Sequence, residues 1–339
     1  MKKLLTLVLA LALVLSLSVA NAEVVFQLAE THFEGYPTTM ADYEFARLVE
    51  ERTEGRVKIE VYSGSVLADS EATAIEMLQA GTLGFTRVSA SPVASYVPAL
   101  NAIQLPYLYK SADHMWAVLD GEIGQNMLDE VQASGSGLIG LCWYDSGSRN
   151  FYTTTKVETP ADLKGLKIRM QNNSMMVDMT NVLGGVGVTG IGPNDIYSAI
   201  TQGTIDGAEN NWPTYYTKGD YEAATFFCLD GHTRVPEVLL GSAEILNGLD
   251  AADLEIIKAC AKETQEYEKM LWAKMEAEAE AAVRANGNTI IEPTAEQVAL
   301  FQAAMTTPSD VLGGVSLYEK YGKGLEEYID AIKAVGENF

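Results

Sequence analysis

The chain has 339 residues, 47% of them apolar, and a formal net charge of −23. This apolar content indicates a folded globular protein and argues against an acidic disordered chain. The strong negative charge argues against nucleic acid and anionic lipid as partners. A chain of this length is expected to form about two domains.

The N-terminus carries the pattern of a secretory signal peptide. Lys2 and Lys3 precede an apolar run over residues 4–19, which is followed by Ala20-Asn21-Ala22. The run is short for a transmembrane helix, and the small residues after it match a cleavage site. We therefore expect cleavage after Ala22 and export to the periplasm, with no stable membrane insertion of the mature chain.

The first part of the mature chain alternates strand and helix patterns. An apolar strand is expected over residues 24–28, and a helix begins near Thr38. Residues 57–61 alternate apolar and charged side chains, which is the period of a half-buried strand. A helix over residues 70–80 and a strand over residues 85–88 complete an α/β unit whose loops can bind a ligand.

A second unit of similar build follows the first. Its expected elements are three strands and two short helices, over residues 138–144, 151–154, 166–170, 174–183 and 195–202. The glycines within residues 184–187 lack the lysine and the spacing of a phosphate-binding loop. They are interpreted as the end of a helix followed by a turn.

The longest helical pattern covers residues 250–286 and ends at Gly287. A helix of this length can brace two lobes from one side. No low-complexity linker separates the halves, so we expect the chain to cross between the lobes more than once. One lobe is assigned residues 23–146 and about 235–274, and the other about 147–234 and 275–339, where the C-terminal segment can pack on both lobes.

Residues that carry enzyme chemistry are sparse. Cys142, Cys228 and Cys260 match no metal spacing and are interpreted as buried side chains, while a Cys142–Cys228 disulfide stays open. The three histidines form no HExxH motif, and no nucleophile stands at a recognisable spacing from a base. We therefore expect no enzyme activity, no catalytic residues, no metal and no cofactor.

Arg169 stands out among the eight arginines because it lies between Ile168 and Met170 in an apolar strand pattern. A buried guanidinium without a partner is costly, so this side chain needs an anion. Two interpretations are open. One is an internal salt bridge with a carboxylate of the chain, and the other is a bidentate clamp on a ligand carboxylate.

Four segments closely resemble the solute-binding subunits of tripartite ATP-independent periplasmic (TRAP) transporters. They are residues 148–153 (SRNFYT), 160–169 (PADLKGLKIR), 204–213 (TIDGAENNWP) and 236–240 (PEVLL). The motifs occur in the order of the family, and the resemblance covers nearly the whole mature chain. It implies an α/β, two-lobed periplasmic binding protein fold with a ligand cleft between the lobes and a long bracing helix.

The resemblance also implies which residues bind the ligand. Arg169 would form the main salt bridge to a ligand carboxylate, Asn210 would hydrogen-bond the same group, and Arg149 would be a second pocket arginine. Further contacts are implied for Glu71, Arg87, His32, Tyr36 and Asn150. Trp212 and Tyr215 have two open interpretations, as pocket walls or as packing at the hinge.

The expected ligand is a sugar acid. Glu71 and His32 at the end away from Arg169 suit hydroxyl groups, since Glu accepts hydrogen bonds and His can donate or accept them. Residues 148–153 and 207–213 also look most like relatives that bind glucuronate and galacturonate. A hexuronate or related aldonate, delivered to TRAP membrane subunits, is therefore expected. The alternatives are a C4-dicarboxylate or other organic acid, a secreted sugar-acid enzyme, and an ABC-type binding protein.

Overall fold

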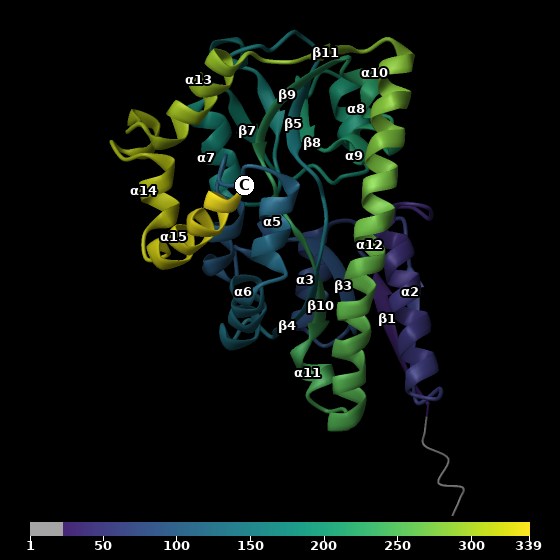
Figure 1. The fold of residues 1–339 in the computed structure, drawn as a ribbon. Coiled ribbons are helices and arrows are strands. Elements are labelled where there is room, and N and C mark those ends of the chain that lie inside the picture. The colour runs from purple at the N-terminus through teal and green to yellow at the C-terminus, as the bar shows by residue number, and fades with distance from the viewer. Residues whose placement is uncertain (1–22) are drawn as a thin grey trace, which may run out of the picture.

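The computed structural model describes residues 23–339, so the expected signal peptide, residues 1–22, lies outside the described part. Two β-sheets lie one above the other, and helix α12 (Ala251–Asn286) runs beside both of them (Figure 1). Helices pack around each sheet. This arrangement confirms the α/β class and the long helix expected from the sequence.

The first sheet has five strands in the order β2-β1-β3-β10-β4. Strand β1 pairs in parallel with β2 and β3, and β10 is antiparallel to β3 and β4. The strands are β1 (Val24–Ala29), β2 (Val57–Tyr62), β3 (Phe85–Ser89), β4 (Leu138–Tyr144) and β10 (Glu237–Ser242). The helices of this half are α2 (Pro37–Arg52), α3 (Glu71–Gln79), α4 (Ala90–Val93), α5 (Ala112–Leu119), α6 (Glu122–Ala133) and α11 (Ala243–Leu246).

The second sheet has six strands in the order β11-β9-β5-β8-β6-β7. Strand β5 is antiparallel to β8 and β9, whereas β6 runs parallel to β7 and β8. The strands are β5 (Arg149–Thr153), β6 (Lys167–Arg169), β7 (Val186–Val188), β8 (Gly207–Asn210), β9 (Phe226–Thr233) and β11 (Thr289–Ile291). Its helices are α7 (Ser174–Val182), α8 (Ile196–Thr201), α9 (Trp212–Thr217) and α10 (Asp220–Ala223).

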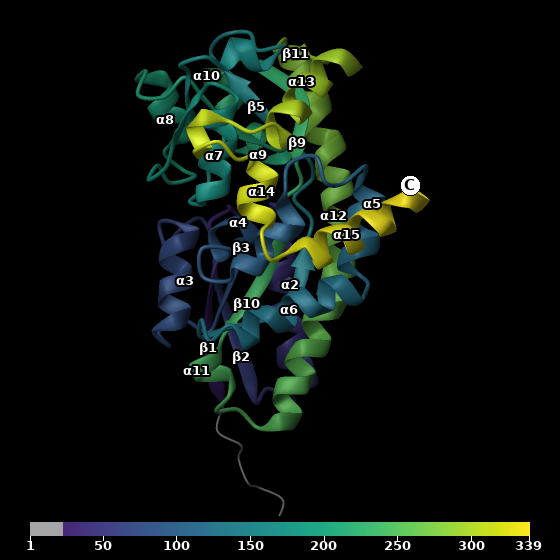
Figure 2. The ribbon, with the colours of Figure 1, turned by 90° about the vertical axis from the view of Figure 1, so that its left-hand side faces the viewer.

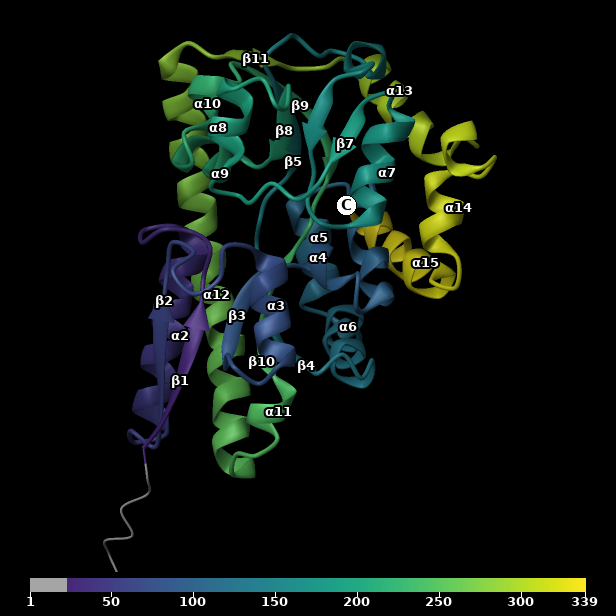
Figure 3. The same cartoon turned by 180° about the vertical axis from the view of Figure 1, so that it is seen from behind.

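Within residues 23–339, three segments connect the two sheets. The chain passes from β4 to β5, returns from β9 to β10, and crosses again along α12 (Figure 3). The Ser146 hydroxyl donates to the Val235 carbonyl and so ties the first two crossings together. Gly147 has a φ angle of +60°, which favours glycine. It lies close to Trp272 of α12, and a side chain at this position would obstruct that approach. The crossings therefore meet at one place, beside α12.

Helix α12 is stabilised by a cap at each end and by apolar residues that it buries along its length. The Asp250 side chain accepts from Ala252 N at the start, and Gly287 adopts φ 90 after the end. Ile257 and Ala261 pack in the core of the first sheet. Ala279 and Val283 pack in the core of the second sheet, so one helix is anchored in both halves.

The C-terminal helices lie on the side opposite α12 (Figures 1 and 2). They are α13 (Ala295–Thr306), α14 (Leu317–Gly322) and α15 (Glu326–Val335). Helix α13 contacts α7 and β9 of the second half, while α15 contacts α5 and α6 of the first half. The C-terminal segment therefore connects the two halves on this side as well. Short 3-10 turns complete the chain: Pro98–Gln104, Pro160–Leu163, Asp310–Leu312 and Gly336–Asn338.

The glycine-rich stretch at residues 184–187 was expected to end a helix and form a turn. Gly184 does turn, at φ 93 just after α7, but Val186–Val188 then forms the edge strand β7. The three cysteines are buried free thiols, and Cys142 and Cys228 lie in different sheets. Within residues 23–339, no helix is both long and apolar enough to cross a membrane.

Candidate functional site

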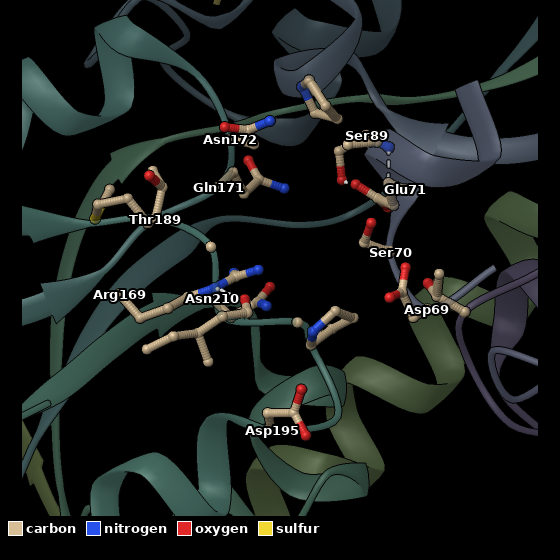
Figure 4. Close-up of a pocket in the computed structure, with 18 of the residues that line it drawn as sticks. Asp69, Ser70, Glu71, Ser89, Arg169, Gln171, Asn172, Thr189, Asp195 and Asn210 are labelled. Atoms are coloured by element: carbon tan, nitrogen blue, oxygen red, sulfur yellow. Dashed lines mark hydrogen bonds between the residues drawn. The ribbon is translucent and has the colours of Figure 1, made fainter. Parts of the chain in front are cut away.

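A cavity of about 390 Å³ lies between the two halves, and both contribute to its walls. Arg169 and Asn210 lie close together on one side, while Glu71 lies across the cavity with Ser70 and Ser89 (Figure 4). The first side comes from strands of the second sheet. The opposite side comes from α3 and the end of β3. The cavity thus has one basic wall and one acidic wall.

Five of the ten expected site residues line this cavity: His32, Glu71, Arg149, Arg169 and Asn210. The other five are not among the residues that line it: Tyr36, Arg87, Asn150, Trp212 and Tyr215.

Arg169 ends strand β6, where its Nε donates to the Ile191 carbonyl at 3.0 Å. Within residues 23–339 it forms no salt bridge with any carboxylate, which disfavours the internal ion pair considered from the sequence. Burial lowers the pKa of Arg169, but a guanidinium keeps its charge in proteins. A cation without a counter-ion therefore faces the cavity, where an anion would stabilise it.

Arg149 begins strand β5 and is nearly fully buried. Its Nε and Nη2 bind the two carboxylate oxygens of Glu209 at 2.5 and 2.8 Å. Its Nη1 donates to Asn210 Oδ1 at 3.1 Å, and Asn211 N donates to the same oxygen at 2.9 Å. Arg149 therefore orients Asn210, whose Nδ2 group stays available as a donor.

Glu209 was not singled out from the sequence, although it stabilises this wall. Burial alone would raise its pKa, but Arg149 and His232 outweigh burial and lower it to about 2. His232 lies between Glu209 and Asp230, with ring nitrogens at 3.3 and 2.9 Å from their oxygens. Burial opposes its charge, yet these two carboxylates raise the pKa of His232 to about 9. The basic wall is thus supported by an ionised, hydrogen-bonded network.

Glu71 is the first residue of α3, which Ser70 caps by accepting from Thr73 N at 3.2 Å. The Glu71 Oε1 atom accepts from Arg87 Nη1, Ser89 N and Ser89 Oγ at 3.0 to 3.3 Å. No donor within residues 23–339 contacts its Oε2 atom. The side chain is 17% exposed, so one oxygen of a fixed carboxylate remains for the cavity.

Arg87 lies behind this wall and is completely buried. Its Nε and Nη2 bind both oxygens of Glu30, and its Nη1 reaches Glu71 at 3.0 Å and Glu237 at 2.6 Å. Glu30 and Glu237 were not expected from the sequence to belong to the site. Arg87 therefore positions carboxylates in this structure and makes no wall of the cavity itself.

His32 lines the cavity and stacks on Tyr36, with ring centroids 3.7 Å apart. Burial, with the charges of Arg87 and Lys218, lowers the pKa of His32 well below its usual value. The imidazole is therefore neutral and can donate or accept. The Tyr36 hydroxyl is 2.9 Å from Thr214 Oγ1 and so links the first half to α9.

The remaining three side chains lie away from the cavity. Asn150 uses both amide atoms on the backbone of Ser148 and Gly231, and lines a separate depression with Trp212 next to α12. Trp212 packs on Phe227 at 4.3 Å. Tyr215 is fully buried and donates to the Ala224 carbonyl. Trp212 and Tyr215 therefore pack within the second half and do not line the cavity.

The cavity carries polar groups of both signs that can bind a ligand. Within residues 23–339, no group of three or more His, Cys, Asp or Glu side chains could hold a metal ion. The basic wall offers guanidinium and amide donors, and the acidic wall offers carboxylate acceptors. Such a cavity suits a small molecule that carries a negative charge at one end and hydroxyl groups at the other.

Comparisons with known proteins agree with this arrangement. A solute-binding protein of Chromohalobacter salexigens is 38% identical over 242 residues, which are 71% of each chain. The TRAP periplasmic solute-binding protein of Pseudomonas putida F1, solved with bound D-glucuronate, is 34% identical with a TM-score of 0.85. That match covers 92% of this chain and 97% of the other. The Xanthobacter autotrophicus Py2 protein, solved with bound β-D-galacturonate, is 34% identical with a TM-score of 0.84, covering 91% and 99%.

The family is established by a match over most of the chain. The model of the bacterial extracellular solute-binding protein family 7 matches residues 28–310. The two solved relatives share the two-lobed fold over more than nine-tenths of this chain. The chain therefore belongs to the bacterial extracellular solute-binding protein family 7, and it is a TRAP solute-binding protein.

Proposed function

We propose that this chain captures a hexuronate such as glucuronate or galacturonate, or a related aldonate, and delivers it to TRAP membrane subunits. Arg169 carries the proposal, because its guanidinium faces the cavity without a carboxylate partner among residues 23–339. Asn210 Nδ2 adds a second donor on the same wall. The relatives solved with bound uronates support the same ligand class.

The acidic wall separates a sugar acid from the dicarboxylate alternative. Glu71 and Glu237 both line the cavity and both bind Arg87 Nη1. A second ligand carboxylate would meet the negative charge of Glu71 there, whereas a hydroxyl group would donate to the free Glu71 Oε2 atom. A hydroxylated monocarboxylate therefore fits both walls, and a C4-dicarboxylate fits only one.

The proposed transport role also includes export of the chain and closure of its lobes over the ligand. Cleavage after Ala22 would release the mature chain into the periplasm. Closure of the lobes, residues 23–146 with about 235–274 against about 147–234 with 275–339, would enclose the ligand. The chain would bind its ligand without a cofactor and without turnover.

A thermal-shift screen of the mature chain, residues 23–339, tests the proposal. D-Glucuronate, D-galacturonate, D-gluconate, succinate and malate are compared, with EDTA present to exclude metal effects. A bound ligand raises the melting temperature by mass action. We expect the uronates or the aldonate to raise it and the dicarboxylates to leave it unchanged. If the dicarboxylates raise the melting temperature and the sugar acids do not, a C4-dicarboxylate replaces the sugar acid as the proposed ligand.

Turnover is tested separately. The mature chain is incubated with the uronate that stabilises it, and the ligand is then recovered and analysed by NMR. We expect the sugar acid back unchanged. A new product that depends on the protein would favour the secreted enzyme instead.

A further inference from the structure

Glu237 is an additional carboxylate of the cavity. It lies within the PEVLL motif, residues 236–240, but the sequence analysis assigned it no contact with a ligand. It begins β10 directly after the second crossing, and its side chain is 5% exposed. Its Oε2 atom accepts from Arg87 Nη1 at 2.6 Å. No donor within residues 23–339 contacts its Oε1 atom. Because Glu237 lines the cavity, Oε1 is available to a ligand.

The charges around Arg87 do not balance if every carboxylate is ionised. Glu30 occupies Nε and Nη2 of the guanidinium, while Glu71 and Glu237 share the single nitrogen Nη1. One positive charge would then face three negative charges in a site with almost no exposure to water. Two carboxylates held by the same nitrogen repel each other, so one of them favours a bound proton.

The hydrogen bonds indicate which carboxylate holds the proton. Glu71 accepts from Arg87 and from two groups of Ser89, so three donors already contact its Oε1 atom. Glu237 accepts from Arg87 alone. Burial raises the pKa of Glu237 to about 8, since Glu71 and Glu30 reinforce the effect while Arg87 and Arg149 oppose it.

The charged and titratable groups that act on Glu237 come from all sides. They are Arg87 of β3, Glu71 of α3, Glu30 after β1, Arg149 of β5, Asp42 and Tyr36 at α2, and Glu268 of α12. Lys218 lies beside the cavity and also titrates near neutral pH, because burial lowers its pKa to about 8. A test must therefore distinguish the titration of Glu237 from that of Lys218.

We propose that Glu237 is a ligand-binding residue that acts as a neutral carboxylic acid, donating from Oε1 to one ligand oxygen while ionised Glu71 accepts from a neighbouring hydroxyl. This inference rests on the proposed sugar-acid function. A sugar presents hydroxyls that donate and oxygens that accept on adjacent carbons, so a donor beside an acceptor fits it. A neutral Glu237 also spares the anionic ligand one repulsive charge.

Calorimetric titration with D-glucuronate at several pH values tests the proton. If only the protonated form binds well, the affinity follows the protonated fraction. With a pKa of about 8, the deprotonation of Glu237 alone should make the wild-type affinity fall about ten-fold between about pH 7 and about pH 9. An affinity that stays constant over this range would overturn the proposal.

Matched variants assign the proton to its residue. Glu237→Gln keeps a donor in the cavity, so its affinity at about pH 7 should stay within about three-fold of wild type, and its fall at higher pH should be about ten-fold smaller than the wild-type fall. Glu71→Gln should lose affinity at every pH, because it replaces the accepting carboxylate. A pH-dependent fall that persists in Glu237→Gln but disappears in Lys218→Met places the proton on Lys218 and overturns the proposal. A ten-fold or larger loss of affinity in Glu237→Gln at about pH 7 also overturns the proposal.

A ligand-free measurement keeps this inference separate from the proposed function. If wild type binds no sugar acid at any pH, the proposed function fails. Carbon-13 NMR of the Glu side-chain carboxyl groups in the ligand-free chain still tests Glu237. A resonance that is absent in Glu237→Gln should titrate near pH 8. If that resonance shows that the Glu237 carboxyl group is already ionised at about pH 6, the inference is wrong.

Discussion

Arg149 Nη1 donates a hydrogen bond of 3.1 Å to Asn210 Oδ1, and this bond fixes which atom of the amide faces the ligand cavity. Asn211 N donates to the same oxygen at 2.9 Å. The amide oxygen of Asn210 is thus occupied by two donors. Its Nδ2 group is left as a donor, which suits a ligand carboxylate and would not suit a cation.

Asn210→Asp tests this orientation. The carboxylate can still accept from Arg149 and Asn211 N, so the fold should be kept. Its second oxygen replaces the Nδ2 donor and repels a ligand carboxylate. A hydrogen bond to a charged group contributes about 1.5–3 kcal/mol, so with the repulsion we expect the affinity for glucuronate to fall by at least about 100-fold in calorimetry. Asn126→Asp, exposed on α6, is the control and should bind like wild type. Equal affinities in both variants would show that Asn210 makes no contact with the carboxylate.

Arg169→Lys should weaken ligand binding much more than it destabilises the fold. Lysine keeps the positive charge but lacks the planar guanidinium with two parallel donors. The loss of one charge-assisted hydrogen bond predicts an affinity reduced roughly 10- to 100-fold, with a melting temperature close to wild type in the absence of ligand. Calorimetry and thermal unfolding measure the two effects. Arg52→Lys, which changes a surface pair with Glu263, serves as the control. A variant that binds as well as wild type would remove Arg169 from the site.

The basic wall was more predictable from the sequence than the acidic wall. Arg169 and Asn210 lie within contiguous motifs, so local sequence was sufficient to single them out, and the cavity does bring them together. Arg87 was expected to contact the ligand, but it is enclosed by Glu30, Glu71 and Glu237. These residues meet because β10 inserts beside β3, a long-range pairing that no local pattern encodes. Their contact with a ligand stays a prediction, which the variants test.

The helices and strands also differ in whether local sequence or long-range contacts determine them. Helix α12 was predictable because its caps and apolar period lie in one continuous stretch, and its bounds agree closely with the expectation. Strands β7 and β11 have three residues each and were not expected. Strand β7 contains Gly187, whose missing side chain makes room for Val177 of α7. A strand this short forms only because a neighbouring strand offers backbone partners, which is a tertiary effect.

His232 should make stability depend on pH in the neutral to alkaline range. Its pKa is raised from 6.5 to about 9 in the folded state, chiefly by Asp230 and Glu209 against the effect of burial. The charged ring therefore contributes stability that is fully present below about pH 6.5 and is lost as pH rises through about 9. The difference in free energy of unfolding between wild type and His232→Gln should shrink by roughly 3 kcal/mol over this range.

Urea unfolding of both proteins at several pH values measures that difference. Taking the difference cancels other groups that titrate in the same range, such as Glu237 and Lys218. A constant difference for His232→Gln would mean that its ring is neutral in the folded protein.

Lys218 should slow the escape of a bound ligand. It follows α9 in the second half, yet its Nζ donates to the Thr31 carbonyl of the first half at 3.2 Å and to Asn194 Oδ1 at 2.7 Å. The same ammonium lies 4.7 Å from the centre of the Phe33 ring. The contacts with Thr31 and Phe33 bridge the two halves beside the cavity, so they can form only when the halves are close.

Lys218→Met keeps the side-chain length and removes the donors. Because the bridging contacts need the two halves to be close, their loss should raise the dissociation rate roughly ten-fold and leave the association rate nearly unchanged. Stopped-flow tryptophan fluorescence with glucuronate measures both rates, at about pH 6.5, where a pKa of about 8 keeps Lys218 charged. Lys164→Met, exposed on the second half, is the control and should match wild type. If the loss of affinity came from slower association, Lys218 would act on the open form, by attracting the anion. An unchanged dissociation rate would show that the bridge does not hold the halves together.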